Sequence, residues 1–322
     1  MLSVAFTMAD QTVKNKRVLV TGGAGFIGSN FANALAGRNE VIVVDDGYLG
    51  TPEHLDSAVE FHERSVLESN LPTDVDVVCH LAALSSYGMH ESNPQRGSKV
   101  NVEGFVNVVE QARRDGCEAV VYASTSSIYG DRTSPTPEDV DVTVNTAYEA
   151  SKLAREAYAE YVSNHYGLPL AGLRFFSVYQ GYGGAEDHKG EFANVIAQFA
   201  DDVANGRSPE LYGDGSQSRD FVHVDDVVRA IELTAANSLD GVFNVGTGER
   251  YSFNTVVDRI NRTLGTDVEA TYVENPIPDN VYVSHTCADT TKIERATGWR
   301  PRIELSEGIE RVCSAYKPVA SR

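Results

Sequence analysis

The chain has 322 residues, 42% of them hydrophobic, and a formal net charge of −19 at pH 7. This length suits one large domain or two closely packed ones, with enough apolar residues for a complete core. No segment approaches the ~18 consecutive apolar residues of a membrane span, so we expect no membrane partner. The negative charge argues against a nucleic-acid partner, because phosphates would be repelled.

The N-terminus and the cysteines indicate a cytoplasmic protein. Residues 1–5 are apolar, but the run is short and lacks a basic flank, so we expect no signal peptide, with a start at Met1 or Met8. The four cysteines lie far apart without a CxxC pair. This spacing predicts neither a zinc site nor a disulfide framework. We therefore expect a reducing cytosol and no bound metal.

The first elements in chain order are a strand, a glycine turn, a helix and a second strand. They are expected at Arg17–Thr21, Phe26–Ala36 and Val41–Val44. Further buried strands and helices follow in alternation. They are expected at Val59–Phe61, Val75–Leu81, Val100–Arg114 (helix), Ala119–Ala123, Ala147–His165 (helix) and Leu170–Leu173. Strands that are apolar on both faces and alternate with helices predict an α/β fold with a doubly wound parallel sheet of the Rossmann type.

After Arg174 the pattern loosens. Glycine-rich loops flank a helix at Phe192–Ala204, and a helix at Asp225–Ala236 with a strand at Val242–Val245 is expected to return to the sheet. The remainder resembles a smaller mixed C-terminal lobe. We therefore predict two parts. Residues 1–174, joined by 222–247, form a dinucleotide-binding domain, and residues 175–221 and 248–322 form the substrate lobe.

A glycine-rich turn joins the first strand to the first helix. Gly22 can take the tight turn, Gly25 lets backbone N–H groups approach a pyrophosphate, and Gly28 lets the helix pack close to the strand. We place Phe26 and Ile27, between these glycines, in the same cofactor-binding set.

An acid follows the turn at the end of the second strand. The Asp45 carboxylate can accept a hydrogen bond from a ribose 2′-OH and would repel a 2′-phosphate. No Arg or Lys lies just after Asp45, which favours NAD over NADP. The alternative is a glycine turn that serves packing alone.

Tyr148 and Lys152 lie four residues apart on one face of a predicted helix, so both can face one pocket. A phenol with a pKa near ~10 is a weak base, but a nearby ammonium and a nicotinamide cation favour its phenolate.

Hydroxyl residues directly follow the buried strand Ala119–Ala123. They lie at the carboxyl edge of the sheet, where parallel sheets bind ligands. We choose Thr125 to bridge the substrate hydroxyl and the tyrosine, with Ser124 and Ser126 as substitutes and helix capping as the alternative role.

These motifs resemble the extended short-chain dehydrogenase/reductase family, and most of all its UDP-glucose (UDP-galactose) 4-epimerase branch. The resemblance covers nearly the whole chain. Its matching segments are Thr21–Gly28, His80–Ala83, Asn101 with Gly104, Ser124–Gly130, Tyr148–Lys152, Leu173–Phe176, Arg219–Asp226, Phe243–Gly246 and Gly298–Pro301.

The resemblance implies NAD as cofactor, a nucleotide sugar as substrate, and further residues around both. Cofactor-binding residues would include Leu81, Ala82, Ala83, Asn101, which also braces the sheet, and Lys152 at the nicotinamide ribose. Substrate-binding residues would be Ser85, Ser124, Ser126, Ser177, Tyr212 and Arg219. The Arg219 guanidinium matches phosphate oxygens, although it could instead pair with Asp220 or Asp225 on the surface.

Departures from the family pattern bear on the reaction. Related dehydratases carry an Asp-Glu pair at the positions of Ser126 and Ser127, and decarboxylases carry a Glu at the latter. Elimination of water needs an acid and a base beyond the tyrosine. Hydroxyls at these positions therefore disfavour both reactions. Ser65 and Ile277–Asn280 replace residues that the family uses for the adenine and the diphosphate, so the carrier nucleotide and the sugar stay open.

We therefore expect NAD-dependent epimerisation at C4 of a nucleotide-activated sugar, with a UDP-sugar favoured, through a transient 4-keto intermediate. The alternatives in the family are a dehydratase, a decarboxylase or a 4-keto reductase. The non-enzyme alternative is a dinucleotide-sensing scaffold. The resemblance also implies a homodimer, joined by a four-helix interface of Val100–Arg114 and Ala147–His165 from each copy.

The charged residues predict how the protein behaves in salt. Its basic residues are 20 arginines and only 7 lysines. A lysine-poor, acid-rich surface suits a protein that stays soluble in concentrated salt, so we hypothesise a halophilic source, against the alternative of an ordinarily acidic cytosolic enzyme. Activity measured across salt concentrations should persist in molar salt. A maximum in dilute buffer followed by a fall in molar salt would contradict the hypothesis.

Overall fold

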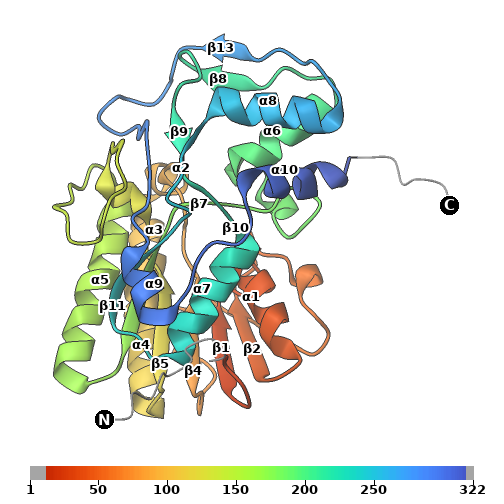
Figure 1. Ribbon diagram of the computed structural model, residues 1–322. Helices are drawn as coiled ribbons and strands as arrows, with labels where there is room; N and C mark the ends of the chain where they lie inside the picture. The colour runs from red at the N-terminus through yellow and green to blue at the C-terminus, as the bar shows by residue number, and fades with distance from the viewer. Residues whose placement is uncertain (1–11, 317–322) are drawn as a thin grey trace, which may run out of the picture.

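A seven-stranded parallel sheet forms the lower part of the protein in the computed structural model, which describes residues 12–316 (Figure 1). The alternative starts Met1 and Met8 lie outside the described residues. The strand order is β11-β6-β5-β4-β1-β2-β3, so β2 and β3 are added on one side of β1 and the later strands, from β4 on, are added on its other side. This confirms the predicted doubly wound sheet. The strands are β1 Arg17–Thr21, β2 Glu40–Asp45, β3 Glu60–Glu63, β4 Val77–His80, β5 Ala119–Ala123, β6 Leu170–Phe175 and β11 Gly241–Val245.

Helices cover both faces of this sheet, because successive strand residues point to opposite sides. Val20 of β1 packs into a core shared with α1 and α7, whereas the preceding Leu19 packs into a second core with α4 and α5. Both residues are almost fully buried, which explains why the strands are apolar along their whole length. The helices are α1 Phe26–Ala36, α4 Gly104–Asp115, α5 Ala147–Tyr166 and α7 Val224–Ala236.

A smaller mixed lobe lies above the carboxyl ends of the sheet strands, as predicted (Figure 1). Three helices pack around an apolar core of their own, in which Ile196, Val256 and Ile309 are fully buried. Three two-stranded ladders complete the lobe and its junction with the sheet. These elements are α6 Val195–Ala204, α8 Phe253–Leu264, α10 Leu305–Ser314, β7 Ser177–Tyr179 with β10 Phe221–His223, β8 Glu210–Tyr212 with β13 Thr271–Val273, and β9 Ser218–Arg219 with β12 Tyr251–Ser252.

Two predicted helices begin differently in the structure. The stretch from Val100 opens with a π-helix, η3 (Lys99–Glu103), before α4 continues with regular pitch. The helix predicted from Phe192 begins at Val195 instead, because the Asn194 side chain caps it by accepting a hydrogen bond from Ile196 N at 3.0 Å.

The last part of the chain crosses back to the sheet, although the sequence placed residues 248–322 wholly in the lobe. Helix α9 (Thr291–Thr297) contacts β11, and the Trp299 side chain lies in the core between the sheet and α7. Asp226 of α7 holds this segment, since its carbonyl oxygen accepts a hydrogen bond from Trp299 Nε1 at 3.0 Å. Its carboxylate also accepts hydrogen bonds at 3.0 Å from Arg302 N and from Ile303 N. Lobe and sheet are therefore joined by several chain crossings.

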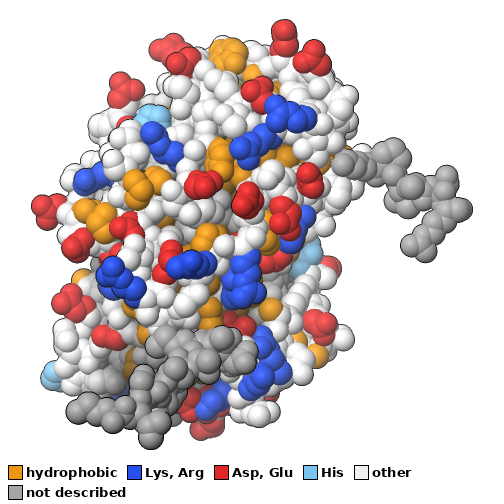
Figure 2. Space-filling view, in the orientation of Figure 1, with side chains coloured by type: hydrophobic (Ala, Val, Ile, Leu, Met, Phe, Trp, Pro, Cys, Tyr) orange, Lys and Arg blue, Asp and Glu red, His pale blue; other side chains and the backbone are white. Residues whose placement is uncertain are grey.

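In residues 12–316, no helix is both long enough and apolar enough to cross a membrane. Acidic side chains are spread over the sheet domain and the lobe on the face that Figure 2 shows, rather than gathered in one patch.

Candidate active site

A cleft of about 570 Å³ lies between the carboxyl ends of the strands and the lobe. It includes the crevice between β1 and β4, where open α/β sheets bind their ligands. Its volume is in the range of small-molecule sites. Most of the predicted site residues line it. They are Gly22, Gly25, Phe26, Ile27, Gly28, Asp45, Leu81, Ala82, Ala83, Ser85, Ser124, Thr125, Ser126, Tyr148, Lys152, Ser177 and Arg219.

Two predicted site residues, Asn101 and Tyr212, are not among the residues that line the cleft. Asn101 is fully buried behind it, where Oδ1 accepts a hydrogen bond from Leu84 N at 2.9 Å and Nδ2 donates to Ser151 Oγ at 2.9 Å. These bonds tie the segment after β4 to α5 behind the cleft wall. The Tyr212 ring lies against Tyr282, at 6.1 Å between centroids, and Tyr282 is the residue that reaches the cleft.

The glycine turn leaves no room for side chains. A Cβ on Gly22 would lie 2.5 Å from Ala82 N, and one on Gly28 would lie 2.2 Å from Gly22 O. Gly22 also has a φ of +68°, in the left-handed region that favours glycine. This close packing of turn, helix and neighbouring strand is what a backbone cradle for a pyrophosphate needs.

Asp45 lies beside the turn, at the end of β2. Its carboxylate accepts hydrogen bonds from Gly47 N at 2.9 Å and Ala24 N at 3.1 Å. Burial raises the pKa of Asp45, and these backbone hydrogen bonds counter part of that rise. The carboxylate is thus fixed at the cleft wall, where it can accept a further hydrogen bond from a ribose hydroxyl.

Tyr148 lies in the first turn of α5, at the edge of the cleft. A capping box fixes this end of the helix, since the Thr146 side chain accepts from Glu149 N and the Glu149 side chain accepts from Thr146 N. Burial raises the pKa of the Tyr148 phenol, whereas a hydrogen bond with Thr125 and the nearby Arg155 guanidinium lower it. Thr125 lies beside the phenol, and it caps the short helix η4 (Ser126–Tyr129) by accepting from Ser127 N at 3.2 Å. Its role as a bridge to a substrate hydroxyl stays a prediction.

Lys152 points to the same part of the cleft. Its Nζ donates to Ala123 O at 3.0 Å and lies 5.7 Å from the centroid of the Tyr148 ring. Burial, and next the Arg155 guanidinium, lower the pKa of Lys152 well below its ordinary value. The sequence predicted that the lysine ammonium favours the phenolate. In the structure, Arg155 is the neighbouring cation that lowers the pKa of the tyrosine.

Arg155 is a residue that the sequence analysis did not single out. Its guanidinium is fully buried and donates to three backbone carbonyls, Asn101 O at 2.6 Å, Ala82 O at 2.8 Å and Ala123 O at 3.3 Å. These carbonyls belong to η3, to the loop after β4 and to the end of β5. One side chain thus ties together the three segments that form the floor of the cleft.

Arg219 reaches the cleft from the lobe side. Its Nη1 donates to Ser284 O at 2.9 Å and to Ser218 O at 3.0 Å, and burial lowers its pKa. The alternative surface pairs do not form. Asp220 accepts from Thr247 N at 2.7 Å and other backbone groups, and Asp225 pairs with Arg311 at 2.9 Å. Other N–H groups of the Arg219 guanidinium are therefore left to bind an anion in the cleft.

Sequence reasoning missed other cations that line the cleft. Arg64 directly follows β3, and Arg96 stacks on the Tyr48 ring, with 3.9 Å from its guanidinium carbon to the ring centroid. The Lys189 ammonium lies 5.5 Å from the centroid of the Phe26 ring, and burial lowers its pKa. Arg64 could have been found from its place at a strand's carboxyl end, but no local pattern marks the other two.

Comparison with known proteins agrees with this geometry. A family model described as the NAD dependent epimerase/dehydratase family matches residues 18–246. A putative UDP-glucose 4-epimerase of Methanocaldococcus jannaschii is 36% identical over 308 residues, which cover 93% of this chain and 98% of the relative.

Solved structures agree in fold. One is a UDP-N-acetylglucosamine 4-epimerase from Methanobrevibacter ruminantium in complex with UDP-N-acetylmuramic acid, with a TM-score of 0.87, 29% identity, and coverage of 94% of this chain and 98% of that one. Another is the UDP-glucose 4-epimerase of Thermus thermophilus in complex with NAD, with a TM-score of 0.82, 32% identity, and coverage of 93% and 98%. Some other relatives bear different names, among them UDP-glucuronic acid decarboxylases of Arabidopsis thaliana and a dTDP-glucose 4,6-dehydratase from Streptomyces venezuelae.

Arg155 offers a test of how the cleft floor is held. We predict that Arg155→Met lowers the free energy of unfolding by about 3 kcal/mol, because buried carbonyls lose charge-assisted hydrogen bonds. NAD affinity should fall as well, since two of these carbonyls lie in cleft segments. Denaturant unfolding and NAD titration measure both effects. Arg155→Lys keeps the charge but not the planar fork, and should recover only part of the loss. Wild-type stability and NAD affinity in both variants would contradict this role.

Proposed function

Because the chain belongs to the NAD dependent epimerase/dehydratase family, we propose that it is an epimerase that inverts C4 of a UDP-sugar. The cofactor of the family is NAD, and the residues around the glycine turn fit it.

The observation that carries the proposal is the set of carboxylates in the cleft wall. Among the described residues that line the cleft, these are Asp45, Asp46 and Glu149. Asp45 and Asp46 lie at the glycine-turn end, and Glu149 is used in the capping box of α5. Beside Tyr148 the wall offers the hydroxyls of Thr125, Ser126 and Ser127 instead. Dehydration and decarboxylation need an additional acid or base near the sugar, whereas epimerisation needs one group that removes and returns a proton.

Bound NAD supplies a hydride acceptor that can also return the hydride. The chain's own residues then handle the proton. Tyr148 accepts the proton of the C4 hydroxyl and later returns it to the same oxygen, while Thr125 holds that oxygen through a hydrogen bond. The Arg155 guanidinium places positive charge near the phenol and lowers its pKa, against the rise caused by burial. The cofactor's own positive charge would act in the same direction. Inversion requires the 4-keto sugar to turn over before the hydride returns to its other face.

Arg219 and the other cations of the cleft support a diphosphate-bearing substrate. A guanidinium whose remaining donors face a low-dielectric cleft binds phosphate oxygens more strongly than it would in water. The relatives named as UDP-sugar enzymes suggest uridine as the base.

We predict that Tyr148→Phe lowers turnover by at least about a hundredfold, because the reaction loses its general base. The fold should persist, since the phenyl ring fills the same space. Initial rates and thermal unfolding of the purified variant check both statements. Tyr158→Phe, an exposed tyrosine on the same helix, is the matched control and should keep full activity. Full activity in Tyr148→Phe would refute the assignment.

The reaction is identified by its product. Incubation with UDP-, dTDP- and GDP-sugars, read by NMR, should give the C4 epimer of a UDP-sugar with no net formation of NADH. Loss of water or of CO₂ from the product would instead assign a dehydratase or a decarboxylase, and net NADH consumption would assign a reductase. No conversion of any sugar, with NAD bound, would support the sensing scaffold.

A homodimer through α4 and α5 is part of the proposal. Tyr158, Tyr161 and Tyr166 of α5 are 44%, 50% and 44% exposed, a cluster of large rings on one helix. Wild-type protein should sediment as a dimer. Tyr161→Asp, which places a charge on this face, should sediment as a folded monomer because a buried charge is costly at an interface. A monomeric wild type, or a variant that remains dimeric, would contradict this interface.

A further inference from the structure

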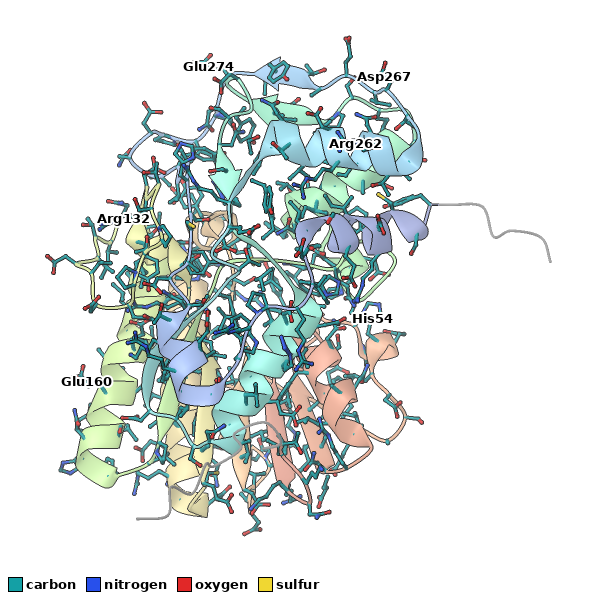
Figure 3. All side chains as sticks on the ribbon, in the orientation of Figure 1. His54, Arg132, Glu160, Arg262, Asp267 and Glu274 are labelled. Carbon is teal, nitrogen blue, oxygen red and sulfur yellow. The ribbon has the colours of Figure 1, made fainter. Side chains whose placement is uncertain are left out.

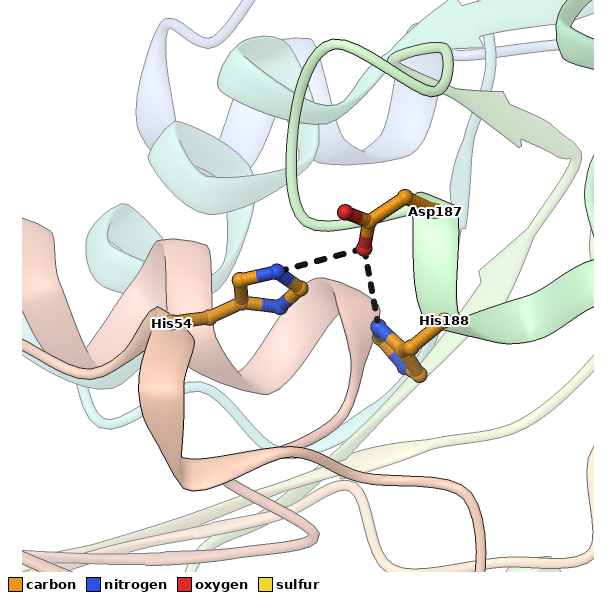
Figure 4. A group of neighbouring side chains, drawn as sticks. All are labelled: His54, Asp187 and His188. Atoms are coloured by element: carbon orange, nitrogen blue, oxygen red, sulfur yellow. Dashed lines mark ion pairs between the residues drawn. The ribbon is translucent and has the colours of Figure 1, made fainter.

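Two histidines and an aspartate that the proposed reaction does not use gather at the edge of the cleft. His54 ends the short helix η2 (Pro52–His54), in the crossover after β2, and lies at the edge of the sheet domain beneath the lobe (Figure 3). Asp187 and His188 begin η5 (Asp187–Phe192), in the loop between β7 and α6. Segments that are far apart in the chain thus bring three possible metal ligands together (Figure 4).

The carboxylate of Asp187 faces both imidazoles. Asp187 Oδ1 lies 3.2 Å from His54 Nε2 and 3.9 Å from His188 Nδ1, and the ring centroids are 5.4 Å apart. One ligand atom from each residue lies within 4.8 Å of the other two. Zn²⁺ bonds of about 2.0–2.1 Å separate tetrahedral ligands by about 3.3 Å. A small rotation of the side chains therefore brings all three onto one ion.

Two ring nitrogens of this cluster are buried and have no hydrogen-bond partner within residues 12–316. They are Nδ1 of His54 and Nδ1 of His188, and the His188 side chain is only 10% exposed. Buried polar atoms are normally paired, so unpaired nitrogens at one spot indicate a missing partner.

We propose that His54, Asp187 and His188 form a binding site for a divalent transition-metal ion of the zinc class, which clamps the two loops together at the cleft. Neutral imidazole and carboxylate are ligands that such ions prefer, and three protein ligands with a water in the fourth position are a common arrangement. Asp187 is half exposed, which leaves a side open for the water. The protein's net charge of −19 attracts cations to its surface.

Both loops are fixed on their own sides before any ion binds. Asn33 of α1 donates from Nδ2 to His54 O at 2.7 Å, which anchors η2 to the sheet domain. On the other side, the buried Glu186 carboxylate accepts from Gln180 N at 2.8 Å and from Asn194 N at 2.6 Å. The ligands are therefore presented by two preformed ends, so binding an ion costs little ordering of the chain.

Each loop also contributes to the cleft wall. Leu49 and Gly50 precede η2, and His188 with Lys189 belongs to η5; all four line the cleft. A metal ion that joins the loops would hold one edge of the cleft closed over the cofactor. Metal and NAD should then raise each other's affinity by the same factor, as linkage requires.

The test uses untagged, EDTA-treated protein titrated with Co²⁺ and Zn²⁺, with and without NAD. We expect one ion per chain, the visible absorption of Co²⁺ bound in a low-symmetry site, displacement of Co²⁺ by Zn²⁺, and an affinity that rises about fivefold or more with NAD. His54→Gln and Asp187→Asn should each weaken binding more than about tenfold. His62→Gln is the matched control. His62 Nε2 also pairs with a carboxylate, that of Glu60, at 2.6 Å, but among the described residues no second histidine joins this pair as a possible metal ligand.

Turnover is not needed for this readout, so its result is independent of the proposed reaction. Absence of binding, or unchanged binding in both cluster variants, would overturn the site and leave the three residues as an ordinary histidine–carboxylate contact. Binding lost equally in His62→Gln would show adventitious surface binding and overturn it too. Equal metal affinity with and without NAD would overturn the clamp.

Discussion

The active site depends on the burial of two neighbouring cations on one face of α5. Lys152 and Arg155 are almost fully buried, and backbone carbonyls accept hydrogen bonds from both. Burying a cation is costly unless its donors are satisfied, so the carbonyls at the ends of β4 and β5 must stay in place for the helix to pack. The same contacts set the positions of the residues that line this part of the cleft.

This arrangement also decides the electrostatics around Tyr148. Burial makes the phenol a weaker acid, and the Thr125 hydroxyl and Arg155 guanidinium act in the opposite direction. Burial, and next the Arg155 guanidinium, lower the pKa of Lys152, and burial lowers the pKa of Arg155 to about 9. A further positive charge beside the phenol would lower its pKa again.

The lobe adds positive charge to the cleft. In a strongly acidic protein, Arg219 and Lys189 line the cleft together with the cations of the sheet domain. Their positions are held from behind by buried acids. Asp220 binds backbone N–H groups of Thr247, Gly248 and Ala288, and Glu186 binds those of the loop before α6. Buried carboxylates thus order the loops, while the cations beside them remain available to an anionic ligand.

The sequence by itself determined the α/β class with its parallel sheet, because strands that are apolar on both faces alternate with helices along the chain. It also determined the glycine turn and the shared helical face of Tyr148 and Lys152, because each depends on residues close together in the chain. Gly22, Gly25 and Gly28 form one turn, and a spacing of four places two residues on one helical face. Only the tertiary structure decided that Asn101 and Tyr212 lie behind the cleft wall, that Trp299 returns to the sheet domain, and that His54 meets His188. The role of Arg155 was also hidden, since an arginine on a helix is most often exposed. Each of these outcomes depends on which distant segments pack together, and packing responds to the shape and burial of the whole chain rather than to any local pattern.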